Sequence, residues 1–469
     1  MNREKSLVKN LGVLSIGTFL PKLLSFVTLP ILTAYLTKED YGTYDFVCTI
    51  VSLLLPAVTL QIQSAAFRFL IECRNDLNKT KSVISNMLVF TFSVSLASII
   101  VVFLCIQSVR FWIRIEIVLY FFIDILLATV QQITRGLGKN MAYSISAVIS
   151  SVANFIVIYF AVYCSRQGLF GVLLALVFSV LAALVYLVIS IKLWKYIDFQ
   201  LLSKVQLISL LKYSWPMVPN NLSSWVLAAS DRIVITAVLG VEANAVYAVA
   251  NKIPNLLKIL QSTFTYAWQE NASIAVNDND SNEYYSNMFD TMFSFLSAAV
   301  AGILLFLPII FNLLIRGDYN EAYVQIPILL IAFMLNCMAV FMGGIYVAHM
   351  KTLNVGITTV VAAIINLLID IVFVNKIGIY AGSISTLVSY AVLLIYRMVD
   401  AKKMEDIHYN YLRLFVQLVL LVLMSCLSVR HSIVSNVLNL CAFVLIVFYY
   451  NKKIMSVAFK TVMRKLKIG

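Results

Sequence analysis

Residues 214–240 read SWPMVPNNLSSWVLAASDRIVITAVLG, and this stretch combines the features that decide the fold. Pro216 and Pro219 stand near its start, a long apolar run follows, and the adjacent charges Asp231 and Arg232 lie inside that run. About 20 apolar residues are needed to cross the hydrocarbon core of a bilayer. A charge at the bilayer centre costs roughly 2.5–3.5 kcal/mol on insertion scales, so it is tolerated where it faces other helices or an aqueous cavity. The stretch therefore predicts a transmembrane helix of a bundle with a polar interior.

The composition of the whole chain is typical of a polytopic membrane protein. Hydrophobic residues make up 61% of the 469 residues and charged residues only 12%, whereas soluble domains carry about 25% charged residues. The seven cysteines are scattered, without a CxxC pair or a ligand-like spacing. Neither a disulfide framework nor a metal site is expected from them.

Apolar runs of membrane-spanning length recur along the chain and predict an all-α protein with about 14 transmembrane helices. The predicted spans are 9–36, 41–69, 83–107, 115–135, 141–164, 168–193, 213–239, 243–269, 286–311, 324–349, 353–374, 378–399, 411–429 and 432–450. The loops between them are too short to hold a soluble catalytic domain. The sequence therefore predicts a protein that is not an enzyme.

Basic residues predict the orientation of these spans. Most of the 35 lysines and arginines fall in the segments on one side of the membrane, together with both termini. The positive-inside rule assigns that side to the cytoplasm. The formal net charge of +13 is thus explained as a topology signal, and no nucleic-acid partner is expected. Basic residues near the inner ends of spans, Arg397 among them, are assigned to the inner segments. Five others are assigned to the spans themselves: Lys22, Arg68, Arg232, Lys252 and Lys258.

The two halves of the chain resemble each other at a spacing of just over 200 residues. LTKEDYGTYDF at 36–46 aligns with LGVEANAVYAV at 239–249, and residues 167–186 align with 377–396. Between these stretches, Asn154 aligns with Asn366. The repeat covers six spans, and an even number preserves orientation across the membrane. We therefore predict two parallel six-helix lobes, at 1–195 and 196–403, followed by two accessory spans and a basic cytoplasmic tail at 404–469.

Polar side chains recur at helical spacing on spans two and eight. Ser52, Thr59 and Gln63 are expected on one face of span two. Asn251, Asn255 and Ser262 form a similar stripe on span eight. Two interpretations stand for these stripes: they line a polar cavity, or they hold neighbouring helices together.

The charged residues inside the spans are the more informative candidates. Lys22 and Lys258 lie far from the outer ends of their spans, so they are expected either to line an aqueous cavity or to pair with an aspartate. Arg68 lies near an inner end, where its side chain is able to reach the membrane surface. Asp231 is expected to pair with Lys252 or to bind a coupling ion, or to form a structural cluster with Arg232 and Lys252.

Several stretches resemble the polysaccharide flippases of the multidrug/oligosaccharidyl-lipid/polysaccharide exporter superfamily, the Wzx-like transporters of O-antigen and capsule repeat units. They are NLGVLSIGTFLPKLLSFVTLPILTAYLTKEDYGTYDF at 10–46, the quoted 214–240, VYAVANKIPNLL at 246–257 and AWQ at 267–269. The resemblance covers essentially the whole chain. It implies a V-shaped, MATE-like bundle of two lobes with a cationic central cavity in the bacterial cytoplasmic membrane.

The same resemblance implies transport of an undecaprenyl-diphosphate-linked oligosaccharide from the inner to the outer leaflet. The five basic residues inside the spans would attract the diphosphate, and the polar stripes would contact sugar hydroxyls. Asp124, Asp231 and Asp370 are the candidates for coupling to H⁺ or Na⁺, and no other cofactor is expected. Expected partners are the lipid-linked glycan, membrane lipid, and the polymerase and chain-length regulator of the same pathway.

Three other functions fit parts of the pattern. A MATE-type drug exporter shares the architecture but has twelve spans and a more acidic cavity. An O-antigen polymerase or ligase is an enzyme of the same pathway, but such enzymes resemble membrane proteins with a long outer loop. A lipid II flippase differs from the repeat-unit flippases only in the details of the signatures at 10–46 and 214–257.

Overall fold

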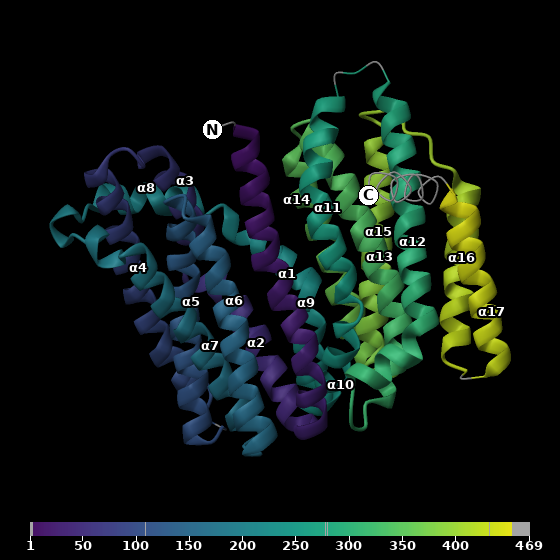
Figure 1. Cartoon of the computed structure of the whole chain (residues 1–469), viewed down its shortest axis with the longest axis horizontal. Helices are drawn as coiled ribbons and strands as arrows, with labels where there is room; N and C mark the ends of the chain where they lie inside the picture. The colour runs from purple at the N-terminus through teal and green to yellow at the C-terminus, as the bar shows by residue number, and fades with distance from the viewer. Residues whose placement is uncertain (1–2, 108, 277, 279, 431, 453–469) are drawn as a thin grey trace, which may run out of the picture. The chain divides into compact units, whose positions relative to one another are not determined.

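The computed structural model describes residues 3–107, 109–276, 278, 280–430 and 432–452, and every secondary-structure element in these ranges is helical (Figure 1). Eleven helices in this part of the chain are long and apolar enough to cross a membrane, and Phe19–Tyr35 is a shorter apolar stretch. Each of the 14 predicted spans overlaps helical residues. The predicted class, an all-α multi-pass membrane protein, is confirmed, whereas the number of 14 crossings is not.

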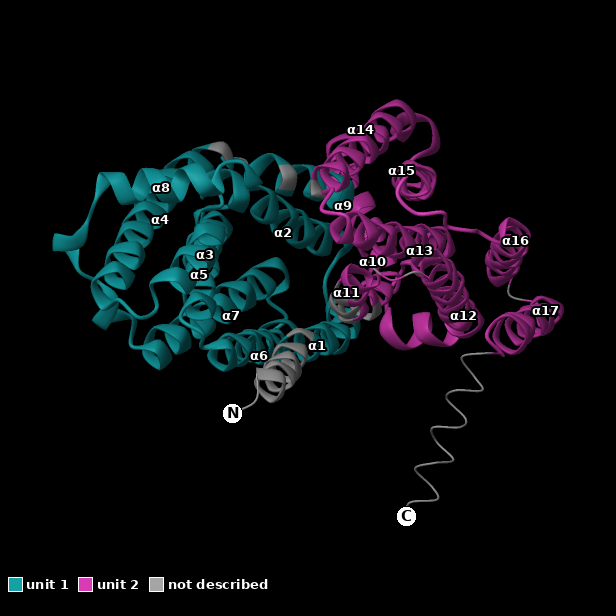
Figure 2. Cartoon of the chain, turned by 90° about the horizontal axis from the view of Figure 1, so that it is seen from above, with its two compact units in different colours: residues 1–229 teal, residues 230–469 magenta. Residues whose placement is uncertain are grey.

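The chain divides into two compact units, residues 1–229 and 230–469, which are distinguished by colour in Figure 2. The division falls within α9, whereas the sequence repeat predicts a boundary near residue 195. The helices of the first unit are α1 (Arg3–Tyr35), α2 (Lys38–Val58), α3 (Ile62–Cys73), α4 (Leu77–Cys105), α5 (Phe111–Gly136), α6 (Asn140–Val157), the π-helical η1 (Ile158–Cys164), α7 (Gly168–Ile191), the short 3₁₀ turns η2 (Leu193–Tyr196) and η3 (Phe199–Leu201), α8 (Lys204–Ser214) and the first part of α9 (Met217–Leu239).

The second unit holds the remainder of α9 and the helices that follow it. They are α10 (Val241–Lys252), α11 (Asn255–Ala275), α12 (Ser281–Leu314), α13 (Asn320–Ala348), α14 (Thr352–Ile377), α15 (Tyr380–Ala401), α16 (Tyr411–Ser428), α17 (Ile433–Val444) and the π-helical η4 (Leu445–Tyr450). The centre of this unit is α13, which packs against α15, α11 and α10. In the most apolar stretch of α13, 83% of the residues are buried. The accessory helices α16 and α17 pack against each other and against α12.

Two predicted spans, 41–69 and 243–269, are each broken into two helices. In the first, α2 ends at Val58 and α3 begins at Ile62, with Leu60 and Gln61 in the left-handed region at φ 48° and 55°. In the second, α10 ends at Lys252 and α11 begins at Asn255, directly after Pro254. Proline has no backbone N–H to continue a helix, so the second break is expected from physical principles. Because of the first break, Gln63 belongs to α3 and not to the helix that carries Ser52.

The core of the first unit consists of apolar side chains that pack between neighbouring helices. In the first unit, Leu70, Ile84, Met87 and Ile133 are fully buried where α3, α4 and α5 meet. In the second unit, many exposed side chains are large and apolar, among them Phe415 at 65% exposed. Such surfaces suit a lipid environment rather than water.

Candidate functional site

Two aspartates are buried next to each other inside the second unit. Asp231 on α9 is 4% exposed and Asp370 on α14 is 1% exposed. Two carboxylates without a compensating cation are costly in an apolar interior. Their hydrogen-bond partners therefore indicate how this pair is tolerated.

Asp231 is held by hydroxyl groups from two neighbouring helices. Its Oδ2 accepts a hydrogen bond from the Tyr247 hydroxyl on α10 and another, 2.7 Å long, from the Thr386 hydroxyl on α15. The Tyr247 hydroxyl also lies 3.2 Å from the carbonyl oxygen of Gly382. A glycine on α15 allows the tyrosine ring to approach closely, because a Cβ at this position would lie only 3.0 Å from the ring.

Asn366 lies on α14, one turn before Asp370, and completes the surroundings of Asp231. In the orientation that gives both ends of its amide a partner, Nδ2 donates to Asp231 Oδ1 over 3.0 Å and to Ser230 over 3.1 Å. Its Oδ1 then accepts from the backbone N–H of Thr386 over 3.3 Å and from the Ser385 hydroxyl over 3.1 Å. In the reverse orientation, the amide oxygen would face the Asp231 carboxylate.

Asp370 differs from Asp231 in that neither of its carboxylate oxygens has a hydrogen-bond partner among the described residues. The two aspartates are close enough for their charges to interact. A buried pair of this kind can share a proton or hold a cation between the carboxylates. The groups described as bonded to Asp231 are two hydroxyls and an amide, and oxygen groups of this kind suit a proton or a hard cation such as Na⁺.

The first unit contains a polar cavity of about 430 Å³ lined by α1, α2, α5, α6 and α7. Asp124 lines it together with Tyr44, Tyr120 and Gln131. Asn154, the counterpart of Asn366 in the sequence repeat, lines the same cavity. Five hydroxyl-bearing residues complete the polar part of the wall: Ser25, Thr28, Ser150, Ser151 and Ser179. The cavity offers both hydrogen-bond donors and acceptors, and a single carboxylate.

The five basic residues predicted within spans have different surroundings. Lys258 is half-buried on α11, with its Nζ 4.5 Å from the centre of the Phe333 ring. Lys22 on α1, Arg232 on α9 and Lys252 on α10 are also half-buried. Arg68 instead pairs with Glu72 over 2.8 Å, and the side chains of both are 57% exposed.

The predicted polar stripe on span two is divided by the helix break. Ser52 is exposed on α2, donates to the carbonyl oxygen of Thr49 over 2.7 Å and accepts from Trp225 Nε1 over 2.8 Å. Thr59 is buried and donates to the carbonyl oxygen of Leu55 over 2.7 Å. Gln63 is buried on α3, and its Oε1 has no partner among the described residues.

The predicted stripe on span eight makes mostly local bonds. Asn251 donates to the carbonyl oxygen of Tyr247 over 2.9 Å, and Asn255 donates to the carbonyl oxygen of Asn251 over 2.8 Å. The second bond connects the two sides of the Pro254 break. The side chain of Ser262 lies outside the described part of the structure.

Two features of the second unit are missed by reasoning from sequence. Tyr247 and Thr386 bind Asp231, but hydroxyl side chains are too common in membrane helices to be singled out. Arg397, predicted on an inner segment, lies on α15 and is 3% exposed. Its guanidinium donates to the carbonyl oxygens of Ala339 and Val355 and to the hydroxyls of Thr358 and Thr359.

One protein-family model matches this chain. The family model described as polysaccharide biosynthesis protein matches residues 7–269. No curated protein sequence matches.

Solved structures of membrane transporters share the fold. The lipid II flippase MurJ in an inward closed conformation has a TM-score of 0.72 at 13% identity, with 94% of this chain and 99% of MurJ covered. An inward-facing multidrug resistance MATE family transporter of the MOP superfamily has a TM-score of 0.68 at 16% identity, with 84% and 98% covered. A MOP superfamily transporter from Pyrococcus furiosus has a TM-score of 0.58 at 15% identity, with 86% and 97% covered. The predicted resemblance to this exporter superfamily is confirmed at the level of the fold.

Proposed function

This chain belongs to the polysaccharide biosynthesis protein family, and we propose that it is a flippase for undecaprenyl-diphosphate-linked oligosaccharide repeat units. It moves them from the cytoplasmic to the outer leaflet of the bacterial cytoplasmic membrane by alternating access. The observation that carries the proposal is a set of half-buried cations retained inside membrane helices of a polysaccharide-biosynthesis protein, with Lys258 on α11 as the main example. Buried cations suit a substrate that carries a diphosphate.

The substrate divides into three chemical parts, each with a different requirement. Each unit supplies candidates for attracting the diphosphate: Lys22 in the first unit, and Lys258, Arg232 and Lys252 in the second. The sugars bind the hydroxyl and amide groups around Asp124 in the cavity of the first unit. The undecaprenyl chain stays in the lipid, because hydrocarbon gains nothing from entering a polar cavity. Exposed on α3 and already paired with Glu72, Arg68 is the weakest diphosphate candidate of the five.

Ion coupling acts through the buried aspartates of the second unit. Without an ion, the Asn366 amide donates to Asp231, in the orientation that satisfies both its ends. If the ion is Na⁺, the carboxylates of Asp231 and Asp370 would hold it, and the Asn366 amide oxygen could serve as a further ligand in the reverse orientation of the amide. When a proton binds instead, it is shared by the carboxylates and the amide keeps its orientation. Either event removes net negative charge from the buried pair, and an ion that binds one conformation more tightly shifts the population towards it.

Orientation follows from the distribution of basic residues, with both termini in the cytoplasm. On this account, the lipid-linked repeat unit is delivered by the enzymes that assemble it on the cytoplasmic leaflet. The polymerase and chain-length regulator of the pathway receive it on the outer leaflet.

A lipid II flippase is the second candidate function. The fold similarity to MurJ extends over 94% of this chain, whereas the MATE family transporter covers 84% of it. Lipid II carries the same undecaprenyl diphosphate, so the cations serve it equally well. The two candidates therefore differ in the sugar that is transported.

Gene deletion and complementation test the proposal. We expect deletion to abolish surface polysaccharide and to leave lipid-linked repeat units on the cytoplasmic leaflet. Wild type and Lys79→Ala restore the polymer, because Lys79 lies on an exposed face with its side chain 75% exposed. Lys258→Ala, expressed at the same level, does not. Accumulation of peptidoglycan precursors instead of repeat units would support the lipid II candidate, and drug sensitivity with normal polymer would support a MATE-type exporter. Outer-leaflet units that remain unpolymerised would indicate an enzyme of the pathway.

A further inference from the structure

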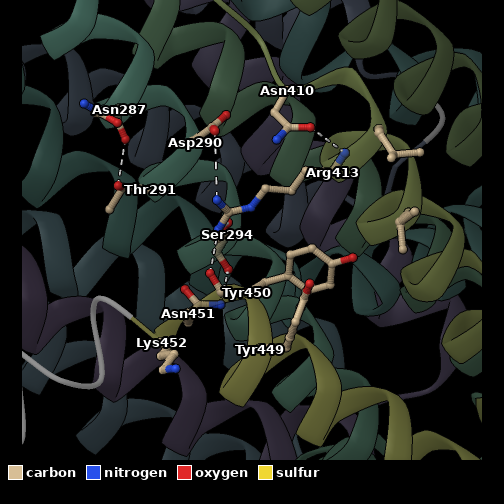
Figure 3. A pocket seen from close by; sticks show the side chains of 12 residues that line it. Asn287, Asp290, Thr291, Ser294, Asn410, Arg413, Tyr449, Tyr450, Asn451 and Lys452 are labelled. Carbon is tan, nitrogen blue, oxygen red and sulfur yellow. Dashed lines mark hydrogen bonds and ion pairs between the residues drawn. The ribbon is translucent and has the colours of Figure 1, made fainter.

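A separate cavity of about 610 Å³ lies in the second unit, between the first turns of α12 and the accessory helices (Figure 3). Asn287, Asp290, Thr291 and Ser294 line it from α12. The start of α16 and the end of η4 supply the other walls, with Arg413 from the former. The site proposed for transport does not include any of these residues.

Arg413 is the dominant group of this cavity, and its donors are incompletely used. Its Nη2 donates to the Ser294 hydroxyl over 2.8 Å and to the carbonyl oxygen of Tyr450. Its Nη1 lies 3.9 Å from the Asp290 carboxylate, beyond hydrogen-bond range. Its Nε is buried and has no partner among the described residues. A guanidinium has five N–H donors and keeps its positive charge, so an anionic group that enters the cavity meets a charged donor there.

The rim of the cavity is apolar and exposed. Leu412 on α16 is 75% exposed and Tyr449 on η4 is 71% exposed. Phe415 on α16 and Phe448 on η4, which do not line the cavity, are 65% and 57% exposed on the same two elements. In a membrane protein such side chains face acyl chains. A ligand in this cavity thus meets polar groups inside it and hydrocarbon at its rim. A phospholipid has the matching arrangement, with a polar head group and apolar acyl chains.

The charges of the cavity select among phospholipid head groups. Arg413 and Lys452 are cationic and Asp290 is anionic, and all three line the same space. A phosphate accepts hydrogen bonds from Arg413 and Lys452. A primary ammonium donates to the Asp290 carboxylate, whereas a quaternary ammonium has no N–H to donate and a glycerol head group has no positive charge.

We propose that this cavity binds the phosphoethanolamine head group of a membrane phospholipid, with the phosphate on Arg413 and Lys452 and the ammonium on Asp290. The acyl chains then lie along Leu412 and Tyr449. The bound lipid joins α12 to α16 and η4, so the two accessory helices outside the internal repeat hold a structural phospholipid. The transport proposal and this one are independent, because lipid binding is measured without a transport substrate.

Native mass spectrometry of the purified full-length protein tests this inference. The delipidated protein is titrated with phosphatidylethanolamine, phosphatidylcholine and phosphatidylglycerol of identical acyl chains. We expect phosphatidylethanolamine to bind at least about tenfold more tightly than the other two, in line with an added charge-assisted hydrogen bond. Arg413→Gln weakens binding of all three lipids. Asp290→Asn removes the preference for phosphatidylethanolamine over phosphatidylcholine and retains binding of both.

Controls separate this result from unfolding and from a free-phosphate site. Lys376→Gln, at an exposed position near the C-terminal end of α14, leaves all three affinities unchanged. A variant is included only if its elution volume in size-exclusion chromatography and its melting temperature match those of wild type. If Arg413→Gln does not fold, Asp290→Asn still tests the proposal. Unchanged lipid binding in Arg413→Gln, or an unchanged head-group preference in Asp290→Asn, overturns the proposal. Displacement of the lipid by millimolar inorganic phosphate also overturns it, because the cavity would then be a phosphate site.

Discussion

Asp231 on α9 and Asn366 on α14 lie face to face inside the second unit, with Asp231 Oδ1 3.0 Å from the end of the Asn366 amide. The amide is able to turn end for end without any movement of the backbone, so it presents either a donor or an acceptor to the carboxylate. Asp370 lies one turn further along α14 and has no hydrogen-bond partner of its own among the described residues. The proposed ion coupling rests on this relationship between the amide and the two carboxylates.

Asp370→Asn is expected to separate stability from coupling. The substitution removes a buried charge with no hydrogen-bond partner, so the melting temperature in detergent should be unchanged or higher. If the ion is Na⁺, wild type should melt at a higher temperature in Na⁺ than in K⁺. If the ion is a proton, wild type should melt at a higher temperature at low pH than at neutral pH. In both cases, binding to the folded state stabilises it. The variant should lose this dependence. A variant that keeps the ion dependence of wild type would exclude Asp370 from the ion site.

Tyr247→Phe removes one of the two hydroxyls that donate to Asp231. The ring and its packing remain, so the expected cost is that of one buried hydrogen bond to a charged group, about 1.5–3 kcal/mol. Melting temperature reports this loss. Tyr163→Phe, at a position on η1 that is 39% exposed, is the matched control and should melt as wild type does. Equal melting of Tyr247→Phe and wild type would mean that the hydroxyl contributes nothing to the site.

Arg397→Lys is expected to be strongly destabilising, although lysine keeps the positive charge. The guanidinium of Arg397 donates to two carbonyl oxygens and two hydroxyls from α13 and α14, and a lysine ammonium with three donors cannot reproduce this planar arrangement. We expect a loss of about 2 kcal/mol or more, since buried acceptors are left without donors. Melting curves of Arg397→Lys and of Arg430→Lys, at an exposed position, provide the comparison. Similar curves for the two variants would contradict this assignment.

Ser52 and Trp225 are expected to be coupled. Trp225 Nε1 donates to the Ser52 hydroxyl over 2.8 Å, although the two residues are far apart in the sequence. A double-mutant cycle with Ser52→Ala and Trp225→Phe should give a coupling free energy of about 0.5–1.5 kcal/mol. Stability of the four proteins to thermal unfolding in detergent measures it. Strict additivity of the two substitutions would show that the bond contributes nothing.

The helical class and the membrane environment could be predicted from composition, and Asp231 and Asp370, which the structure buries together, stand out in the sequence as charges within apolar runs. Tyr247 and Thr386 could not be predicted, since a hydroxyl acquires its role only when another helix brings it to a carboxylate. The break at Leu60 and Gln61 could not be predicted either, because neither residue is a glycine, the residue type that favours the left-handed backbone found there. The buried position of Arg397 could not be predicted either. The carbonyl oxygens that accept its hydrogen bonds lie on α13 and α14, so the sequence around Arg397 does not indicate them.

The measurement that tests the central claim most directly is the leaflet distribution of lipid-linked repeat units in cells depleted of this protein. Repeat units in intact and permeabilised spheroplasts are labelled with an impermeant reagent, with the peptidoglycan precursor as an internal reference. The account predicts that repeat units accumulate and become accessible only after permeabilisation, whereas the peptidoglycan precursor is distributed as in wild type. Repeat units that remain accessible at the outer face at the wild-type level would contradict it.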